Sequence, residues 1–326
     1  MRGGLRRAAL AILLLAGLAA CESSTLAPRK TEVPPHARPS ELRPADPESE
    51  APREPSLASH DLEVYYARVQ ADLLTQGLLR TDGGGPDTPF TDTMLARNFE
   101  RIALAEEYER GAGLRPSRGE LGRVKKWTKP VRVSAEFGAL VPEDQRVQDR
   151  NMLIQYVNRL NRVTGHPISM TTGAANFHVL FMSEDDKAQI APRIRQLVPD
   201  VSPSALEVFE NLPRSIHCLV IAFSENPGGY AYGEAIAVIR SEHPDLLRRS
   251  CIHEEVAQGL GLGNDWPEAR PSIFNDDDEF ALLTTHDEML LKILYDPRLK
   301  PGMDADTARP IVKDLAAQLA GGLGPS

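Results

Sequence analysis

Residues 246–263 read LLRRSCIHEEVAQGLGLG, and this stretch decides the fold that the sequence predicts. Apolar residues recur along it at the spacing of an α-helix, which gives the helix one face for the core. The residues on that face are Ile252, Val256, Gly259 and Leu260. Glu254 and Gln258 are one turn apart on the opposite side, with Glu255 beside them. The stretch therefore predicts a helix with a group of polar side chains on one face.

Two glycines end the predicted helix. Gly261 and Gly263 can adopt the positive φ angles that turn a chain back at a helix C-terminus, so the residues that follow cross the helix end. A helix followed by such a turn can supply three ligands to one metal ion. The candidate metal ligands are Glu254, Gln258, Asn264 and Asp265.

Two plainer interpretations of these residues stay open. A polar helix face is often solvated surface, and Gln258 and Asn264 could hydrogen-bond each other across the turn. A literal zinc motif that begins at His253 is excluded, because Ala257 stands where the second histidine is needed.

Aligned from Glu254, the stretch resembles the active-site helix of matrixin-type zinc peptidases, H-E-x-x-H-x-x-G-x-x-H. The resemblance places Glu255 at the general base and Gly261 at the glycine. Glu254, Gln258 and Asn264 replace the three histidines. It implies a zincin (metzincin)-like α+β fold with a mixed sheet, a long helix, the active-site helix and a C-terminal helix. It also implies that the metal ligands of that clan have been lost or altered.

A longer part of the chain, from about Thr91 to Met303, resembles a bacterial lipoprotein family known as domain of unknown function 2927. The motifs that carry this resemblance are Glu254–Gln258, Leu260–Asp265 and Leu294–Leu299. The family has no established activity, so the resemblance implies a fold and leaves the function open.

The candidate ligands also indicate which cofactor to expect. Zinc favours imidazole and thiolate, whereas carboxylate and amide oxygens suit hard cations. We therefore expect no metal or one divalent ion, with Ca²⁺ or Mg²⁺ favoured over zinc bound through unexpected ligands. Without a strong Lewis acid, Glu255 alone is a weak catalyst. These residues favour a pseudoenzyme, although a metal-dependent hydrolase stays open.

The N-terminus has the pattern of an export signal. Arg2, Arg6 and Arg7 precede an apolar run from Ala8 to Ala16 that is too short to span a membrane. The segment then ends in Leu-Ala-Ala-Cys21 and resembles the bacterial lipoprotein signal, in which that cysteine is acylated. The resemblance implies a protein of the bacterial cell envelope, facing the periplasm or the exterior and anchored to the membrane through Cys21. The alternative is an ordinary secretory signal that happens to contain a cysteine.

The predicted location in the cell envelope bears on the state of the remaining cysteines. With Cys21 acylated, Cys218 and Cys251 remain where disulfides are permitted, and we expect them to be bridged. Two buried free thiols are the alternative.

The predicted organisation has five parts. Residues 1–20 form the signal peptide, and residues 21–60, with eight prolines and no aromatic residue, form a disordered tether. The other parts are an N-terminal helical region (61–122), the zincin-like domain (123–303) and a C-terminal helix with its tail (304–326).

Hydrophobic periodicity adds the elements of the predicted α+β fold with its mixed sheet. The predicted strands are 131–137, 168–172, 177–182, 218–223 and 235–239. The other predicted helices are 61–77, one that runs from a cap at Thr91 or Asp92 through Tyr108 and is ended by Gly111, 145–163, and two short ones within 187–212.

Two functions compete for this protein. The first is binding or scaffolding, in which the former substrate cleft holds a peptide strand or an envelope partner by β-augmentation. The second is a peptidase-like hydrolase that uses Glu255 with an atypical metal site. No nucleic-acid partner is expected, because a chain with a net charge of −9 lacks the excess of basic residues that phosphate binding requires.

Overall fold

The computed structural model describes residues 54–106, 115, 117–275 and 277–321, which belong to one compact unit. The predicted signal peptide, its acylated Cys21 and most of the predicted tether lie outside the described residues. Within the described ranges, no helix is both long and apolar enough to cross a membrane.

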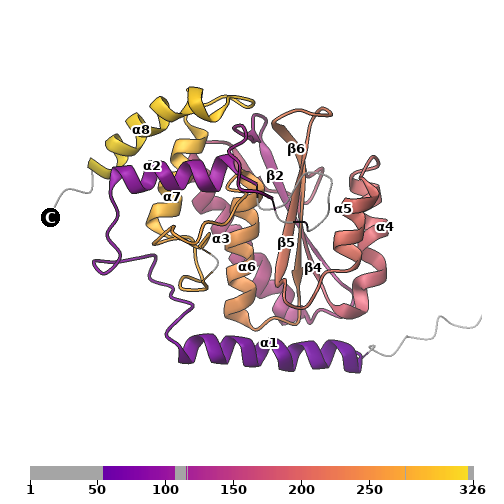
Figure 1. The fold of residues 1–326 in the computed structure, drawn as a ribbon. Helices are drawn as coiled ribbons and strands as arrows, with labels where there is room; N and C mark the ends of the chain where they lie inside the picture. The colour runs from indigo at the N-terminus through magenta and orange to yellow at the C-terminus, as the bar shows by residue number, and fades with distance from the viewer. Residues whose placement is uncertain (1–53, 107–114, 116, 276, 322–326) are drawn as a thin grey trace, which may run out of the picture. The chain divides into compact units, whose positions relative to one another are not determined.

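A six-stranded mixed sheet lies at the centre of the fold (Figure 1). Its strands are β1 (Lys126–Trp127), β2 (Val131–Phe137), β3 (Ile168–Met170), β4 (Phe177–Met182), β5 (Cys218–Ser224) and β6 (Ala231–Arg240). The order β1-β6-β4-β2-β3 is parallel throughout, and β5 joins β6 in antiparallel orientation. The predicted α+β fold with a mixed sheet is confirmed, whereas its relation to zincins stays a prediction.

Eight α-helices are present among the described residues. They are α1 (Leu57–Thr75), α2 (Asp92–Phe99), α3 (Glu143–Thr164), α4 (Lys187–Leu197), α5 (Pro203–Glu210), α6 (Asp245–Leu260), α7 (Thr285–Tyr295) and α8 (Ala305–Gly321). A π-helical turn (Glu100–Leu104) continues α2, and a 3-10 turn (Glu184–Asp186) precedes α4.

Helices cover both faces of the sheet. All six residues of β4 are buried, as expected for an inner strand of a parallel sheet. In Figure 1, α3, α6 and α7 lie on one side of the sheet and α4 and α5 on the other. Phe177 and Phe181 belong to the core shared with α6, whereas Leu180 and Met182 belong to the core shared with α4 and α5.

Several element boundaries differ from the prediction. α1 begins at Leu57 rather than near residue 61, because the hydroxyl of Ser56 accepts a hydrogen bond from the Ser59 N–H and caps the helix. β6 is longer at both ends than the predicted strand 235–239. Its first residues pair with β1 and β5, and its last residue, Arg240, pairs with Met182 of β4. β3 ends at Met170, two residues earlier than predicted.

The helix predicted from Thr91 or Asp92 through Tyr108 is shorter than expected. Thr91 caps α2, one of the two predicted cap residues, but the α-helix ends at Phe99 and the π-helical turn ends at Leu104. Consecutive residues of this turn, Ile102, Ala103 and Leu104, are all buried, which a regular amphipathic helix does not allow. The predicted end at Tyr108 and the glycine expected to terminate the helix, Gly111, lie outside the described residues.

Candidate functional site

The helix predicted from residues 246–263 is α6. Its predicted core residues, Ile252, Val256, Gly259 and Leu260, are all buried. Between Cys251 and Leu260, Glu254 and Gln258 alone are half-buried, so the two polar side chains share the accessible side of the helix. Glu255 is only 3% exposed, so this carboxylate is not part of a solvated surface.

Two long-range hydrogen bonds hold the C-terminal turn of α6. The indole Nε1 of Trp127 donates to the Gly259 carbonyl at 2.8 Å, and the hydroxyl of Tyr295 donates to the Leu260 carbonyl at 2.9 Å. The last carbonyls of a helix have no partner within it, so both side chains satisfy groups that would otherwise be buried and unpaired. Sequence spacing does not reveal these contacts, because they join distant parts of the chain.

Gly259 lets α6 pack closely against the sheet, and Gly261 ends the helix. A Cβ atom on Gly259 would lie 2.4 Å from Cζ of Phe177 in β4, so only glycine permits this approach of helix and sheet. Gly261 ends the helix with φ +124°, as predicted. Gly263 does not have a positive φ, so the predicted turn needs one left-handed glycine rather than two.

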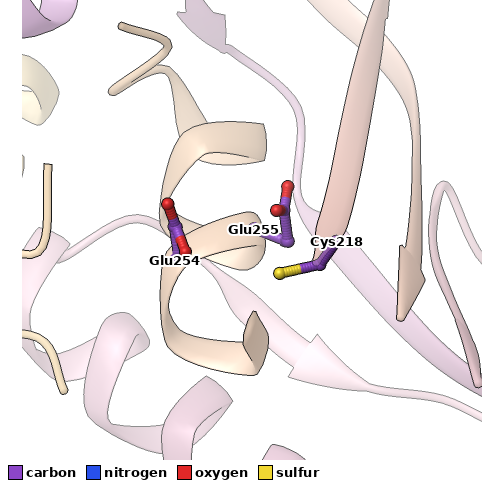
Figure 2. Close-up of side chains that lie close together, drawn as sticks. All are labelled: Cys218, Glu254 and Glu255. Atoms are coloured by element: carbon purple, nitrogen blue, oxygen red, sulfur yellow. The ribbon is translucent and has the colours of Figure 1, made fainter. Parts of the chain in front are cut away.

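One cluster of ligand-type side chains forms where α6 faces the start of β5. Single ligand atoms of Cys218, Glu254 and Glu255 all lie within 4.8 Å of one another. Figure 2 shows Glu255 on the side of α6 that faces Cys218. Glu255 and Cys218 are buried and Glu254 is half-buried. The two adjacent carboxylates therefore belong to one partly enclosed acidic site.

Sequence analysis did not place Cys218 beside these carboxylates. A signal was available, because Cys251 precedes Glu255 by one helical turn and the two therefore lie on the same side of α6. Any partner that is bridged to Cys251 must then lie near Glu255.

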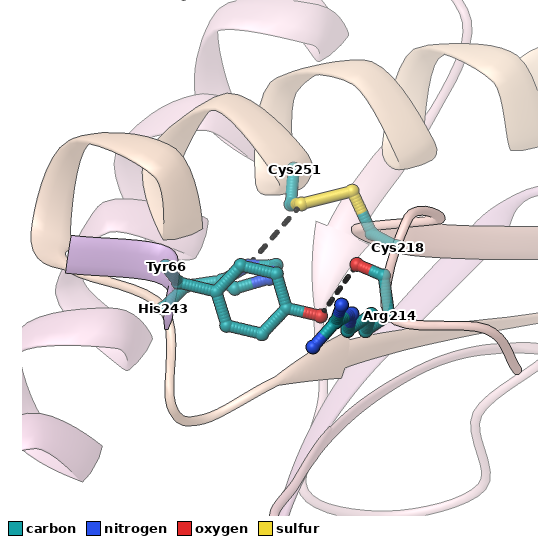
Figure 3. Close-up of a disulfide and its surroundings, with 5 residues drawn as sticks. All are labelled: Tyr66, Arg214, Cys218, His243 and Cys251. Atoms are coloured by element: carbon teal, nitrogen blue, oxygen red, sulfur yellow. Dashed lines mark hydrogen bonds between the residues drawn. A yellow bond between two sulfur atoms is a disulfide. The ribbon is translucent and has the colours of Figure 1, made fainter. Parts of the chain in front are cut away.

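The predicted disulfide between Cys218 and Cys251 is present, with their Cα atoms 5.8 Å apart. It joins the first residue of β5 to α6 and lies against His243 and Tyr66 (Figure 3). The rings of His243 and Tyr66 meet edge to face at 4.2 Å. Burial holds the pKa of His243 well below its usual value, so its imidazole is neutral.

The residues of the turn after α6 are more dispersed than their spacing suggested. The side-chain amide of Asn264 donates to the carbonyls of Arg101 at 2.9 Å and Asp265 at 2.7 Å. Asp265 lines the same cavity as Glu254 and Gln258 but lies outside the cluster of ligand atoms. The four candidate ligands stay a prediction, with Asn264 oriented toward backbone carbonyls.

The acidic cluster opens into a cavity of about 1330 Å³ that runs along β5. All seven residues of β5 line it, together with Glu254, Glu255 and Gln258 of α6. The lining includes eight carboxylates and three basic side chains, so the cavity as a whole is acidic. The carboxylates are Glu106, Asp200, Glu225, Glu234, Glu254, Glu255, Asp265 and Asp278, and the basic residues are Lys125, Lys129 and Arg132.

β5 is an edge strand. It pairs with β6 alone, so its other edge carries no strand in the part of the chain that the structure describes. From Val220 to Ser224 its residues are half-buried. Alternate residues face opposite sides of the sheet: Cys218, Val220 and Ala222 pack with the core that contains α6, while Leu219, Ile221 and Phe223 pack with α4 and α5.

Residues 92–314 match the model of the family described as "Protein of unknown function (DUF2927)". The chain belongs to this family. The matched region of the DUF2927 protein includes the whole sheet, α6 and the cavity along β5, while α1 precedes it. No curated protein and no solved structure matches the chain significantly. Because the family description states no activity, the function must be argued from the site itself.

Proposed function

We propose that this DUF2927 protein is a lipid-anchored envelope protein that binds an extended, basic segment of a protein partner along β5 without cleaving it. The membrane anchor rests on the Leu-Ala-Ala-Cys21 pattern alone. The binding mode rests on the open edge of β5 inside a cavity, which is the observation that carries the proposal.

An edge strand offers a row of backbone N–H and C=O groups to an incoming strand, which gains affinity from main-chain hydrogen bonds. β5 has seven residues, enough to pair with a segment of similar length. Because the cavity extends past both faces of the strand, alternate side chains of a bound segment would have room on either side.

The charge of the cavity lining indicates which kind of peptide segment would bind there. Carboxylates outnumber basic groups in the cavity, and Lys129 is already paired with Glu225 at 3.1 Å. A segment that carries Lys or Arg would gain favourable electrostatics, whereas an acidic one would be repelled. Among the lining carboxylates, Glu225 directly follows β5, and Glu234 lies opposite Phe223 in the pairing of β5 with β6.

A library of labelled seven-residue peptides, titrated into the full chain, tests this proposal. Peptides rich in Lys and Arg should bind, matched peptides with Glu should not, and added salt should weaken the binding. Glu225→Lys should reduce affinity for the basic peptides. Glu63→Lys, an exposed position on α1, is the matched control and should leave affinity unchanged. Equal binding of basic and acidic peptides would contradict the proposal.

The alternative function is hydrolysis with Glu255 as the general base. The specific observation in its favour is the pair Glu254 and Glu255 at the wall of a cavity large enough for a peptide. Under this alternative, Glu255→Gln abolishes turnover of any cleaved peptide and leaves the fold unchanged. Under the binding proposal, the same variant retains most of its affinity and no peptide is cleaved by the unmodified chain. Mass spectrometry of the peptide library after incubation separates the two.

A further inference from the structure

One face of β5 has α6 running alongside it. Cys251 of the helix is bridged to Cys218, the first residue of the strand. About two turns further along the helix, a Cβ atom on Gly259 would lie 3.2 Å from Cγ2 of Val220. The wall that α6 contributes to the cavity beside this part of β5 is polar, and it consists of Glu254, Glu255 and Gln258.

The wall on the other face of β5 is largely apolar. α4 and α5 cover this face (Figure 1). Ile221 of the strand and Leu197 and Val198 at the end of α4 belong to one apolar cluster, and all three are half-buried. They line the cavity together with Ala205 and Val208 of α5. This wall therefore leaves apolar surface open to the cavity, and covering that surface would be favourable.

The polar groups on this second wall do not make it acidic beside the first half of β5. Asp200, Ser202 and Ser204 lie between α4 and the first turn of α5, and Asp200 is exposed. Glu234 lies opposite Phe223, near the end of the strand, with one oxygen 2.8 Å from Nε2 of His178. The two walls therefore differ in kind, one acidic beside Cys218 and the other apolar beside Leu219 and Ile221.

The pleat of a sheet assigns each residue of a bound segment to one of these walls. Residues directly opposite each other on paired strands point to the same face, with Cβ atoms about 4.5–5.5 Å apart. A residue opposite Cys218 or Val220 therefore points toward α6, and one opposite Leu219 or Ile221 points toward α4 and α5. Single ligand atoms of Cys218, Glu254 and Glu255 lie within 4.8 Å of one another (Figure 2). The position opposite Cys218 is thus beside both carboxylates.

We propose that the segment bound along β5 alternates basic and apolar residues, an inference that rests on the proposed function. Lys or Arg lies opposite Cys218 and Val220, and apolar side chains lie opposite Leu219 and Ile221. The basic side chains gain from the acidic wall, and the apolar ones cover the half-buried surface of the other wall. A segment with its basic residues in one block would place some of them against the apolar wall, where they lose solvent without gaining a partner.

Two labelled seven-residue peptides of identical composition, titrated into the full chain, test the inference. One is Lys-Val-Lys-Val-Lys-Val-Lys and the other is Lys-Lys-Lys-Lys-Val-Val-Val. The alternating peptide should bind about tenfold more tightly, because only it matches both walls along its whole length. Equal affinity for the two would leave binding along β5 intact and overturn the alternation. If neither peptide binds, the proposed function fails and the inference fails with it.

Two variants assign the peptide side chains to the walls. Leu197→Ser should weaken binding of the alternating peptide about threefold and leave Lys-Ser-Lys-Ser-Lys-Ser-Lys unaffected. Glu254→Gln should weaken binding of the alternating peptide about threefold and leave Gln-Val-Gln-Val-Gln-Val-Gln unaffected. Val64→Ser, at an exposed position of α1, is the matched control for Leu197→Ser and should change neither affinity. If Leu197→Ser weakened the valine and serine peptides equally, the apolar wall would not select the segment and the inference would be overturned.

Discussion

The indole nitrogen of Trp127 donates a 2.8 Å hydrogen bond to the carbonyl oxygen of Gly259, which links β1 directly to the last turn of α6. Trp127 is 1% exposed, so its N–H and the carbonyl satisfy each other out of contact with solvent. This contact fixes the end of the helix whose polar face lines the cavity. The position of Glu254 and Gln258 therefore depends on a residue far from them in the sequence.

Trp127→Phe should lower the free energy of unfolding by about 1–3 kcal/mol, because the Gly259 carbonyl is left buried without its donor. Urea denaturation of the oxidised protein measures the change. Trp266→Phe is the matched control, since Nε1 of Trp266 has no hydrogen-bond partner among the described residues. Equal losses of unfolding free energy in Trp127→Phe and Trp266→Phe would show that the hydrogen bond between Trp127 and Gly259 contributes nothing to stability.

Gly259→Ala should destabilise the protein by about 1–3 kcal/mol through overpacking. The added Cβ would lie 2.4 Å from Cζ of Phe177, whose ring is fully buried and has little room to move. At Gly263 an added Cβ meets nothing within 4 Å, so Gly263→Ala should be close to neutral. Thermal melting of both variants checks this, and a harmless Gly259→Ala would contradict the close packing of α6 on β4.

Asp149→Ala should cost about 3–5 kcal/mol, because it leaves the guanidinium of Arg248 buried without its main partner. Nε of Arg248 lies 2.6 Å from Oδ1 of Asp149, and both side chains are almost completely buried between α3 and α6. Asp245 pairs with the same arginine at 2.8 Å but is largely exposed. Asp245→Ala should therefore cost less than about 1 kcal/mol in the same denaturation assay.

Stability should fall as the pH drops below about 6.5, with His253 as one cause. Burial, with Arg159 and Arg249 nearby, lowers the pKa of His253 to about 3 in the folded protein. The unfolded chain binds a proton near pH 6.5 and the folded chain does not, so acid favours unfolding between these two values.

His253→Gln should flatten this dependence between about pH 6.5 and pH 5, although it lowers stability at neutral pH. The loss at neutral pH follows because the Leu283 N–H donates to Nδ1 of His253 at 3.1 Å. Urea midpoints across this pH range provide the test, with exposed His60→Gln as the control. If the urea midpoint of His253→Gln fell with decreasing pH as steeply as that of the unmodified chain, His253 would be excluded as a cause of the acid sensitivity.

Local pattern predicted much of this fold. The strands 131–137 and 177–182 have the predicted bounds, because period-two alternation and continuous apolar runs report burial directly. The core face of α6 and the Cys218–Cys251 bridge were also correct. The π-helical turn at Glu100–Leu104 was missed, since its three consecutive buried residues follow tertiary packing rather than helical periodicity.

The site was less predictable than the fold. Helical spacing put Glu254 and Gln258 on one side of α6, where both are half-buried, but their role as ligands stays a prediction. Whether Glu255 is exposed or buried depends on β5, which approaches it from another part of the chain. The orientation of Asn264 is set by the Arg101 carbonyl in the π-helical turn. The first contact could be inferred only through the predicted bridge between Cys218 and Cys251, and the second has no local sequence signal.

Binding along β5 is the central claim, and one titration tests it most directly. A labelled seven-residue Lys- and Arg-rich peptide is added to the full chain and to Ala222→Tyr, which places a large ring on the half-buried strand inside the cavity. Ala71→Tyr, at an exposed position of α1, controls for the added ring. We predict salt-sensitive binding to the unmodified chain and to Ala71→Tyr, and none to a folded Ala222→Tyr. Undiminished binding to Ala222→Tyr would contradict the account.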